Sequence, residues 1–182
     1  MRASWWWTIS APLARMPKAG ELVVCDELPL SIGGLAANAS VGLARLGVRT
    51  SISGCVGEDI FGDYATKFLR DAGVDVRHLI RRPNVGTAGT LIVNIIGEDR
   101  RFIHTRGGNA TYSVADVPDD VLAKCKVLYL GGLLLLNRMS EPGAAAGLFR
   151  RAPNSASKPS STSSCPVWPF RATSTIVRCS KK

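Results

Sequence analysis

Residues 33–40 read Gly33-Gly34-Leu35-Ala36-Ala37-Asn38-Ala39-Ser40 and follow a short apolar run that ends at Ile32. Two glycines directly after a strand let the backbone approach a ligand with no Cβ in the way. The small residues that follow predict a helix, whose first unpaired N–H groups point back toward the glycines. Asn38 carries an amide that both donates and accepts hydrogen bonds, which suits a hydroxyl-rich ligand. A plain strand-to-helix turn, capped locally by Asn38, fits the same spacing, and the residues alone leave both alternatives open.

Strand and helix signals alternate on both sides of this turn. We expect strands at Glu21–Cys25, Leu28–Ile32, Thr50–Val56, Gly89–Ile96, Arg101–Thr105 and Val127–Leu130, an extended segment at Val74–Leu79, and helices at Ala36–Leu46, Ile60–Ala72 and Glu141–Arg151. Asp59 is a good N-cap for the second helix, and Gly73 ends it. Gly97 and Asp99 predict a hairpin between the strands on either side of them. Ser113 and Asp116 are spaced as a capping box that opens a short helix. This alternation predicts an α/β sandwich with a small extra β-sheet beside it.

Length and composition exclude several classes of protein. The chain has 182 residues, of which 46% are hydrophobic and 20% charged, so it is long enough for one domain with a core. No apolar run reaches the ~18 residues that a membrane span needs, so we expect no membrane partner. Residues 1–7 lack the apolar stretch of a signal peptide, which favours a cytoplasmic location. The 5 Cys and 2 His show no metal-ligand spacing, and we predict no metal site.

The formal net charge of +9 raises the possibility of a nucleic-acid partner. Residues 17–152, however, hold 16 Lys and Arg against all 14 Asp and Glu. The remaining positive charge lies at the two ends of the chain. The pairs Arg81–Arg82 and Arg100–Arg101 fall in expected turns. Solvent-exposed surface is a simpler interpretation of these pairs than a site that binds the phosphates of a nucleic acid. We therefore expect no nucleic-acid partner, and keep a basic nucleic-acid binder as the third hypothesis.

Several motifs together resemble the ribokinase-like, or PfkB, carbohydrate kinases. The Gly33–Gly34 pair, Asn38 four residues later and Ala44-Arg45-Leu46-Gly47 match the N-terminal signature of that family. The resemblance continues through Gly57–Gly62, Ala72–Asp75, the Thr87–Thr90 strand, Gly97–Arg100 and Gly108–Ala110, and covers roughly residues 17–151.

The resemblance implies a fold and a ligand. It implies a partial Rossmann-like α/β sandwich of the ribokinase type, with residues 21–32 and 89–105 forming a small β-sheet lid over a sugar. Gly33, Gly34 and Asn38 would contact sugar hydroxyls, and Asn109 would lie in a loop near the pocket. Asp59 would be a helix cap rather than a ligand contact. Two lids would pair into a homodimer.

The catalytic part of the family pattern is missing from this sequence. The family has a late Gly-x-Gly-Asp motif that supplies an anion hole and an Asp base, and this chain has no Asp after Asp120. The family's Asn-x-x-Glu metal motif is also absent, because Asn137 and Glu141 are four residues apart. ATP and Mg²⁺ are thus expected for the intact family member, whereas their binding sites are absent from this chain. We assign no catalytic residue. The resemblance implies the N-terminal part of an ATP-dependent sugar kinase, which transfers the γ-phosphate of ATP to a carbohydrate hydroxyl in its intact form, and we expect the chain as given to have no kinase activity. The alternative is a non-catalytic sugar- or nucleoside-binding module.

Both ends of the chain depart from the family. Where the family has an early Gly-x-x-x-x-Asp strand whose Asp grips the sugar, this chain reads Ser4-Trp5-Trp6-Trp7-Thr8. Read one base earlier, codons permitted for these residues give Val-Val-Val-Asp, with the Asp at Thr8. The same shift from Ser157 to Val167 permits an apolar strand containing an Asp. We therefore divide the chain into an aberrant N-terminus at 1–16, the partial kinase domain at 17–152, and an aberrant or disordered tail at 153–182.

Overall fold

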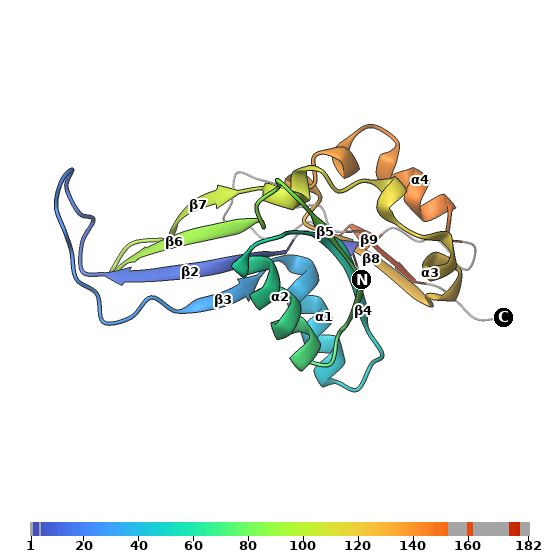
Figure 1. Cartoon of the computed structure of the whole chain (residues 1–182), viewed down its shortest axis with the longest axis horizontal. Coiled ribbons are helices and arrows are strands. Elements are labelled where there is room, and N and C mark those ends of the chain that lie inside the picture. The colour runs from blue at the N-terminus through green and yellow to red at the C-terminus, as the bar shows by residue number, and fades with distance from the viewer. Residues whose placement is uncertain (1, 4, 153–159, 162–174, 179–182) are drawn as a thin grey trace.

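In the part of the chain that the structure describes, the fold contains two β-sheets and four α-helices (Figure 1). The computed structural model describes residues 2–3, 5–152, 160–161 and 175–178. A six-stranded central sheet has the order β5-β4-β1-β8-β10-β9, and a four-stranded sheet has the order β3-β2-β6-β7. Figure 1 shows the second sheet projecting sideways from the rest of the molecule. This projecting sheet is hereafter the lid.

The strands of the central sheet run mainly parallel. They are β1 (Arg2–Ala3), β4 (Ser51–Gly57), β5 (Asp75–Arg82), β8 (Val127–Gly131), β9 (Ser160–Ser161) and β10 (Thr175–Arg178). β1 lies between β4 and β8 and is parallel to both, and β4 is parallel to β5. Almost every residue of β4 is buried, as expected for a strand covered on both faces. The predicted Val127–Leu130 strand is confirmed.

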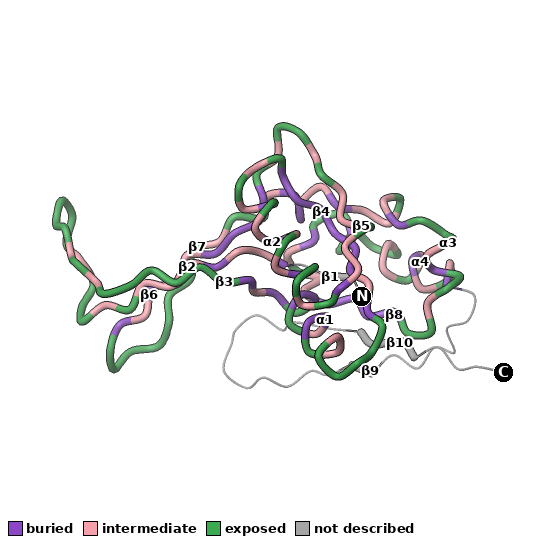
Figure 2. The backbone as a smooth tube through the Cα atoms, turned by 60° about the horizontal axis from the view of Figure 1, so that its bottom comes forward, coloured by how far each residue is buried: buried purple, intermediate pink, exposed green. Residues whose placement is uncertain are grey.

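Helices cover both faces of the central sheet. α1 (Leu35–Arg45) and α2 (Ile60–Asp71) pack with Trp5, Ile52 and Val56 in one apolar cluster. α3 (Asp119–Lys124) and α4 (Ala144–Arg150) pack with Leu128 and Leu130 in a second cluster on the other face. Figure 2 shows that the buried residues gather in this body, whereas the far end of the lid is largely exposed.

The ends of the two long helices follow the sequence signals. Gly47 and Gly73 lie just beyond α1 and α2, with φ angles of 77° and 82°. This left-handed backbone is the conformation that favours glycine after a helix. Asp59 caps α2, as predicted, because its side chain accepts a hydrogen bond from the Gly62 amide.

The lid contains β2 (Trp6–Leu13), β3 (Leu30–Gly33), β6 (Gly89–Ile95) and β7 (Arg101–Thr105). β6 and β7 form the predicted antiparallel hairpin, and β2 lies between β3 and β6. The predicted strand at Glu21–Cys25 is wrong. Leu22 and Val24 alternate as in a strand, but they are 83% and 84% exposed, and none of the described strands pairs with this segment. The lid contains the tryptophan-rich strand β2 instead.

Other boundaries differ by a few residues. α4 begins at Ala144 rather than Glu141, because Pro142 and Gly143 form a turn in which Gly143 has a φ angle of 81°. The capping box at Ser113 and Asp116 is confirmed and opens the 3-10 helix Val114–Asp116. Further 3-10 helices lie at Gly107–Ala110, Leu133–Leu135 and Arg138–Ser140.

The structure describes only part of the two end segments, residues 1–16 and 153–182. Residues 5–13 belong to the fold, with Trp5 fully buried and β2 inside the lid. The predicted tail lies mostly outside the described residues; within it, β9 and β10 are strands, and β10 is antiparallel to β8.

Candidate functional site

The Gly33–Gly34 turn joins β3 to the N-terminus of α1. Gly34 is the N-cap residue and has a φ angle of 97°, which side chains other than glycine rarely adopt. A Cβ on Gly33 would lie 2.9 Å from Thr8 Oγ1 and 3.1 Å from Trp6 Nε1. Both glycines are therefore required by the backbone geometry and by the close approach of β2.

No side chain caps the N-terminus of α1, and its first turn holds no acidic residue. The Asn38 amide N–H donates to the Gly34 carbonyl at 3.0 Å, which closes the first helical turn. The Asn38 side chain is exposed and has no hydrogen-bond partner among the described residues. An uncapped helix N-terminus and a free amide side chain can together bind hydroxyl or anionic oxygens.

Polar side chains line the lid face beside Gly33. Thr8 on β2, Thr90 on β6 and His104 on β7 are paired across the three strands, so their side chains point to the same face. His104 Nδ1 lies 2.7 Å from Thr90 Oγ1, and Trp6 packs edge-on against the His104 ring at 5.1 Å. We call Trp6, Thr8, Thr90 and His104 the lid row. Sequence reasoning missed Thr90 and His104, because cross-strand register is not a local signal.

Two causes lower the pKa of His104. Burial lowers it, and the neighbouring Arg106 lowers it further. Its Nε2 is buried and has no hydrogen-bond partner within the described part of the chain. A neutral imidazole with one unused nitrogen can donate to or accept from a ligand, depending on its tautomer.

The opposite face of β2 fixes the lid to the body. Trp7 stacks on Phe61 with the ring centroids 4.2 Å apart, and its Nε1 donates to the Thr87 carbonyl at 3.3 Å. Trp5 is fully buried in the cluster with α1 and α2. Alternation along the strand therefore sends Trp5 and Trp7 into the protein and leaves Trp6 and Thr8 on the Gly33 face.

Asp59 ties three segments together. Its carboxylate accepts hydrogen bonds from Gly62 N at 2.8 Å, Thr87 Oγ1 at 2.6 Å and Thr87 N at 2.7 Å. Thr87 Oγ1 in turn accepts from Gly57 N at 2.9 Å. The Gly57–Gly62 motif thus builds a structural connection between β4, α2 and the segment that leads into the lid.

We expect Asp59→Asn to destabilise the protein by about 1–3 kcal/mol, the range for losing hydrogen bonds to a charged acceptor. Burial acts to raise the pKa of Asp59, but the hydrogen bonds from Thr87 and Gly62 outweigh it and hold the pKa below its ordinary value. The ionised form therefore stabilises the fold above pH about 4, and this stabilisation is lost as the pH falls below that value. Urea denaturation at pH 7 and pH 3 measures both effects. An Asp59→Asn deficit that is no smaller at pH 3 would contradict the assignment.

Asn109 lies inside the protein. It is fully buried, and its Nδ2 donates to the Trp5 carbonyl at 3.0 Å, whereas its Oδ1 has no partner among the described residues. Gly107 and Gly108 fit tightly, since a Cβ on them would lie 2.2 Å from the Gly86 carbonyl and 2.9 Å from Cys55 Sγ. Of the four predicted site residues, Gly33, Gly34 and Asn38 lie together in one turn, whereas Asn109 is bonded to Trp5 between β1 and β2.

Within residues 2–3, 5–152, 160–161 and 175–178, no three His, Cys, Asp or Glu side chains lie close enough to hold a metal ion. The Asp59 carboxylate accepts the three hydrogen bonds described above. The helices in the described part of the chain are all too short or too polar to span a bilayer.

Comparisons with known proteins identify the family that this chain resembles. Residues 5–171 match the profile of the pfkB family of carbohydrate kinases. The matched range includes parts of both end segments. A 5-dehydro-2-deoxygluconokinase from Clostridium perfringens is 28% identical over 120 residues, which are 64% of this chain and 36% of that protein. The chain thus spans little more than a third of the length of this curated relative.

Solved structures share the fold. The crystal structure of Sa239 has a TM-score of 0.69 at 20% identity, covering 84% of this chain and 50% of that one. Arabidopsis thaliana ribokinase complexed with ribose and ATP has a TM-score of 0.58 at 21% identity, covering 68% of this chain and 46% of that one. With the profile match over residues 5–171, the chain belongs to the pfkB family of carbohydrate kinases.

Proposed function

We propose that this chain is the sugar-holding, N-terminal part of an ATP-dependent sugar kinase, which in its intact form transfers the γ-phosphate of ATP to a carbohydrate hydroxyl. The observation that carries the proposal is the uncapped N-terminus of α1, with Asn38 free beside it and the lid row adjoining Gly33. Hydrogen-bond donors and acceptors from α1, Asn38 and the lid row lie around the Gly33–Gly34 turn. Sugar hydroxyls, which donate and accept, match such a set.

Each group has a role in this proposal. Gly33 and Gly34 let the sugar reach the backbone, and the first amides of α1 and the Asn38 side chain bind its hydroxyls. Thr8, Thr90 and His104 of the lid row cover the other side of the sugar, and the Trp6 ring narrows the space beside Thr8. Asn109 holds the β1–β2 junction and reaches a sugar only after a rearrangement of its side chain.

We further propose that this 182-residue chain does not turn over ATP. The sequence has no Asp after Asp120, so the family's base and anion hole have no counterpart. General base catalysis alone contributes roughly 10²–10⁴-fold, and phosphoryl transfer also needs the nucleotide and its Mg²⁺ in place. An ATP-consumption assay with ribose, fructose and 5-dehydro-2-deoxygluconate tests this. Turnover above a no-sugar control would contradict it.

A non-catalytic sugar- or nucleoside-binding module is the second candidate, favoured by the intact Gly33–Asn38 turn. We expect millimolar sugar to raise the melting temperature without ATP, because a ligand that binds only the folded state stabilises it. Asn38→Ala should abolish this increase in melting temperature. The substitution should leave the fold intact, because the exposed Asn38 side chain has no partner among the described residues. A shift of equal size in both proteins would place the binding elsewhere.

We propose that two lids pair into a homodimer in the cytoplasm. Exposed apolar side chains on and beside the lid strands support this: Ile96 is 80% exposed, Ile103 64% and Phe102 40%. Size-exclusion chromatography with light scattering should give twice the 19.4 kDa of one chain, and Ile103→Asp should return the monomer. A monomer at all concentrations would contradict the pairing.

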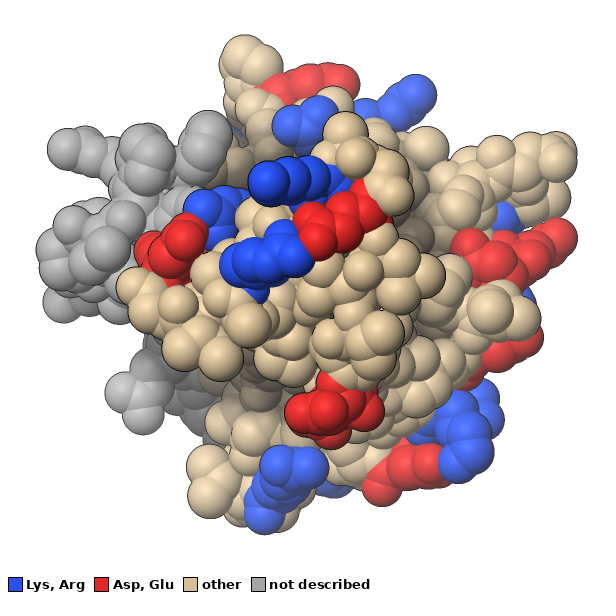
Figure 3. Space-filling view, turned by 90° about the vertical axis from the view of Figure 1, so that its left-hand side faces the viewer, with Lys and Arg blue, Asp and Glu red and all other residues tan. Residues whose placement is uncertain are grey.

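We do not expect nucleic acid as a partner. On the lid end of the molecule, Lys and Arg alternate with Asp and Glu and form no continuous patch of one sign (Figure 3). Several of these charges are paired, including Arg15 with Glu21 and Arg101 with Glu98. Salt-dependent retention on DNA that survives removal of residues 1–16 and 153–182 would contradict this expectation.

We also propose that residues 1–16 and 153–182 are read out of frame on either side of an authentic kinase segment. The proposal rests on Trp5–Thr8, whose permitted codons give Val-Val-Val-Asp in the other frame. The nucleotide sequence tests it. AGY codons at Ser160, Ser161, Ser163 and Ser164, or the absence of a restored reading frame downstream, would contradict it.

A further inference from the structure

Arg106 follows the lid row at its β7 end, two residues after His104. Thr105 between them is the last residue of β7 and has strand conformation. Side chains alternate along a strand, so those of His104 and Arg106 leave the same face of the lid. Burial lowers the pKa of His104, and the positive charge of Arg106 lowers it further, as expected for neighbours on one face.

The loop after β7 fixes the backbone from which the Arg106 side chain extends. The Arg106 carbonyl accepts a hydrogen bond from Asn109 N at 3.0 Å, and Gly108 N donates to the Gly86 carbonyl at 2.9 Å. A Cβ on Gly107 would lie 2.2 Å from that Gly86 oxygen, so the loop packs tightly on the segment before β6. The guanidinium group itself is exposed and has neither an ion pair nor a hydrogen bond among the described residues.

The neighbouring His104 ring offers a hydrogen-bond donor to the same space. Thr90 Oγ1 lies 2.7 Å from His104 Nδ1 and can donate to it, which leaves the ring proton of the neutral form on Nε2. His104 Nε2 is buried and has no partner within the described part of the chain. Buried polar atoms in folded proteins are nearly always hydrogen-bonded. An unpartnered Nε2 beside an unpaired guanidinium therefore favours a ligand group that accepts hydrogen bonds from both.

The charges around this face favour an anion. None of the described strands β2, β3, β6 and β7 contains an Asp or Glu, and the first turn of α1 contains none either. The unpaired amides at the N-terminus of α1 add a partial positive charge. One guanidinium and one neutral imidazole match the single negative charge of a carboxylate better than the nearly double charge of a phosphate.

We propose that the ligand of this site is a sugar acid, whose carboxylate forms an ion pair with Arg106 and accepts a hydrogen bond from His104 Nε2. The inference rests on the proposed function, since the hydroxyls of the same molecule are held by Gly33, Gly34 and Asn38. β3 and β7 are the two edges of the lid, so the carboxylate lies at the end of the ligand away from those hydroxyls. Arg106 is then the residue that selects sugar acids over neutral sugars.

Calorimetric titration with matched pairs of compounds tests the inference. D-gluconate and D-glucitol differ only in a carboxylate or a hydroxymethyl group at one end, and D-ribonate and ribitol form a second such pair. We expect the full chain to bind the acid of at least one pair roughly tenfold to a hundredfold more tightly than its alcohol, the range for a hydrogen bond to a charged group. Arg106→Gln should make the two affinities of that pair equal.

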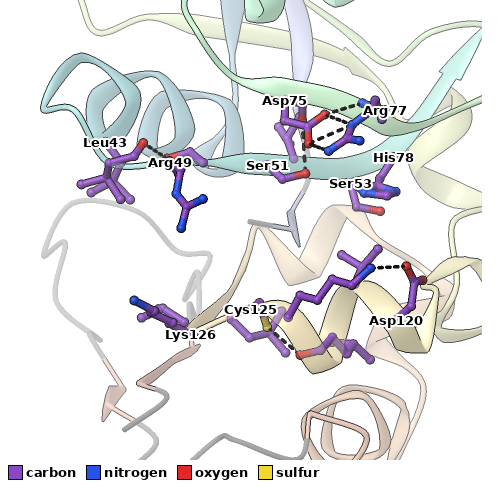
Figure 4. A pocket seen from close by; sticks show the side chains of 18 of the residues that line it. Leu43, Arg49, Ser51, Ser53, Asp75, Arg77, His78, Asp120, Cys125 and Lys126 are labelled. Atoms are coloured by element: carbon purple, nitrogen blue, oxygen red, sulfur yellow. Dashed lines mark hydrogen bonds and ion pairs between the residues drawn. The ribbon is translucent and has the colours of Figure 1, made fainter. Parts of the chain in front are cut away.

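Arg49→Gln is the matched control for Arg106→Gln. Arg49 is also exposed and also has no ion pair among the described residues. It lies beyond the C-terminal end of α1, where Figure 4 shows it with Leu43 at a cavity of about 920 Å³ that no residue of the sugar site lines. This variant should keep the preference of the parent for the acid.

The outcomes separate this inference from the proposed function. Equal affinities for acid and alcohol in both pairs would overturn the inference and leave the proposed function standing, because the polyol would still bind. A preference for the acid that survives Arg106→Gln, or that Arg49→Gln removes, would also overturn it, as would no binding of any of the four compounds. Failure of the proposed function is recognised separately, because Asn38→Ala would then bind both members of a pair as tightly as the parent does.

Discussion

Gly57→Ala should destabilise the protein by about 3 kcal/mol or more, a large share of the ~5–15 kcal/mol that stabilises a typical domain. A Cβ on Gly57 would lie 2.1 Å from the Val85 carbonyl oxygen and 2.9 Å from Thr87 N, both of them backbone atoms. β4 and the segment before β6 would have to separate. That movement breaks the bond from Gly57 N to Thr87 Oγ1 and strains the three hydrogen bonds of Asp59.

Gly42→Ala is the matched control for this prediction. Gly42 lies inside α1, and a Cβ there would meet nothing within 4 Å. Alanine in a helix interior is more favourable than glycine by roughly 0.5–1 kcal/mol, so this variant should be slightly more stable than the parent. Urea denaturation of both variants gives the comparison. A Gly57→Ala variant within about 0.5 kcal/mol of the parent would show that β4 and the lid segment are not in the contact described.

The double variant Trp6→Val with Thr8→Asp should bind sugar roughly tenfold to a hundredfold more tightly than the parent. Thr8 adjoins Gly33, with its Oγ1 2.9 Å from the position that a Gly33 Cβ would take, so an Asp carboxylate at this position adjoins the same turn. A hydrogen bond to a charged group contributes about 1.5–3 kcal/mol, which gives that range of affinity. Trp6→Val removes the large side chain beside it and makes room for the ligand.

The double variant Trp6→Val with Thr8→Val is the control, because it opens the same space but adds no carboxylate. Calorimetric titration with the sugar that gives the largest thermal shift measures all three proteins. We expect the order of affinity to be the Asp variant, then the parent, then the Val variant. Equal affinities for the two double variants would contradict the placement of residue 8 at the sugar.

Local signals predicted most of the fold. Asp59 before an apolar-periodic stretch and Gly73 after it specify α2, and the glycines around residue 33 and at 47 specify α1, because caps and left-handed glycines act within a few residues. Glu21–Cys25 shows where this reasoning fails. Its alternation of Leu22 and Val24 fits a strand, but a strand forms only where another strand pairs with it, and the sequence cannot show that β2 occupies the lid position instead.

The site was predicted in part for the same reason. Gly33, Gly34 and Asn38 lie within one turn, so spacing alone brings them together. The lid row depends on the register between β2, β6 and β7. This register pairs Thr8 with Thr90, about 80 positions away, and Thr90 with His104, 14 positions away. Asn109 illustrates the opposite case, because a polar residue in a glycine-rich loop suggests a ligand contact, whereas in the fold it is fully buried and bonded to the Trp5 carbonyl.

The proposed function requires that the Gly33–Asn38 turn holds a sugar. Two-dimensional ¹H–¹⁵N spectra of the full chain, recorded during a titration with ribose and, in parallel, with 5-dehydro-2-deoxygluconate, test this requirement. For the sugar that binds, we predict the largest saturable shifts at the backbone amides of Gly33 to Asn38 and at the Asn38 side-chain amide, with smaller shifts at His104. Shifts confined to other parts of the protein, or no saturable shift with either compound, would contradict the claim.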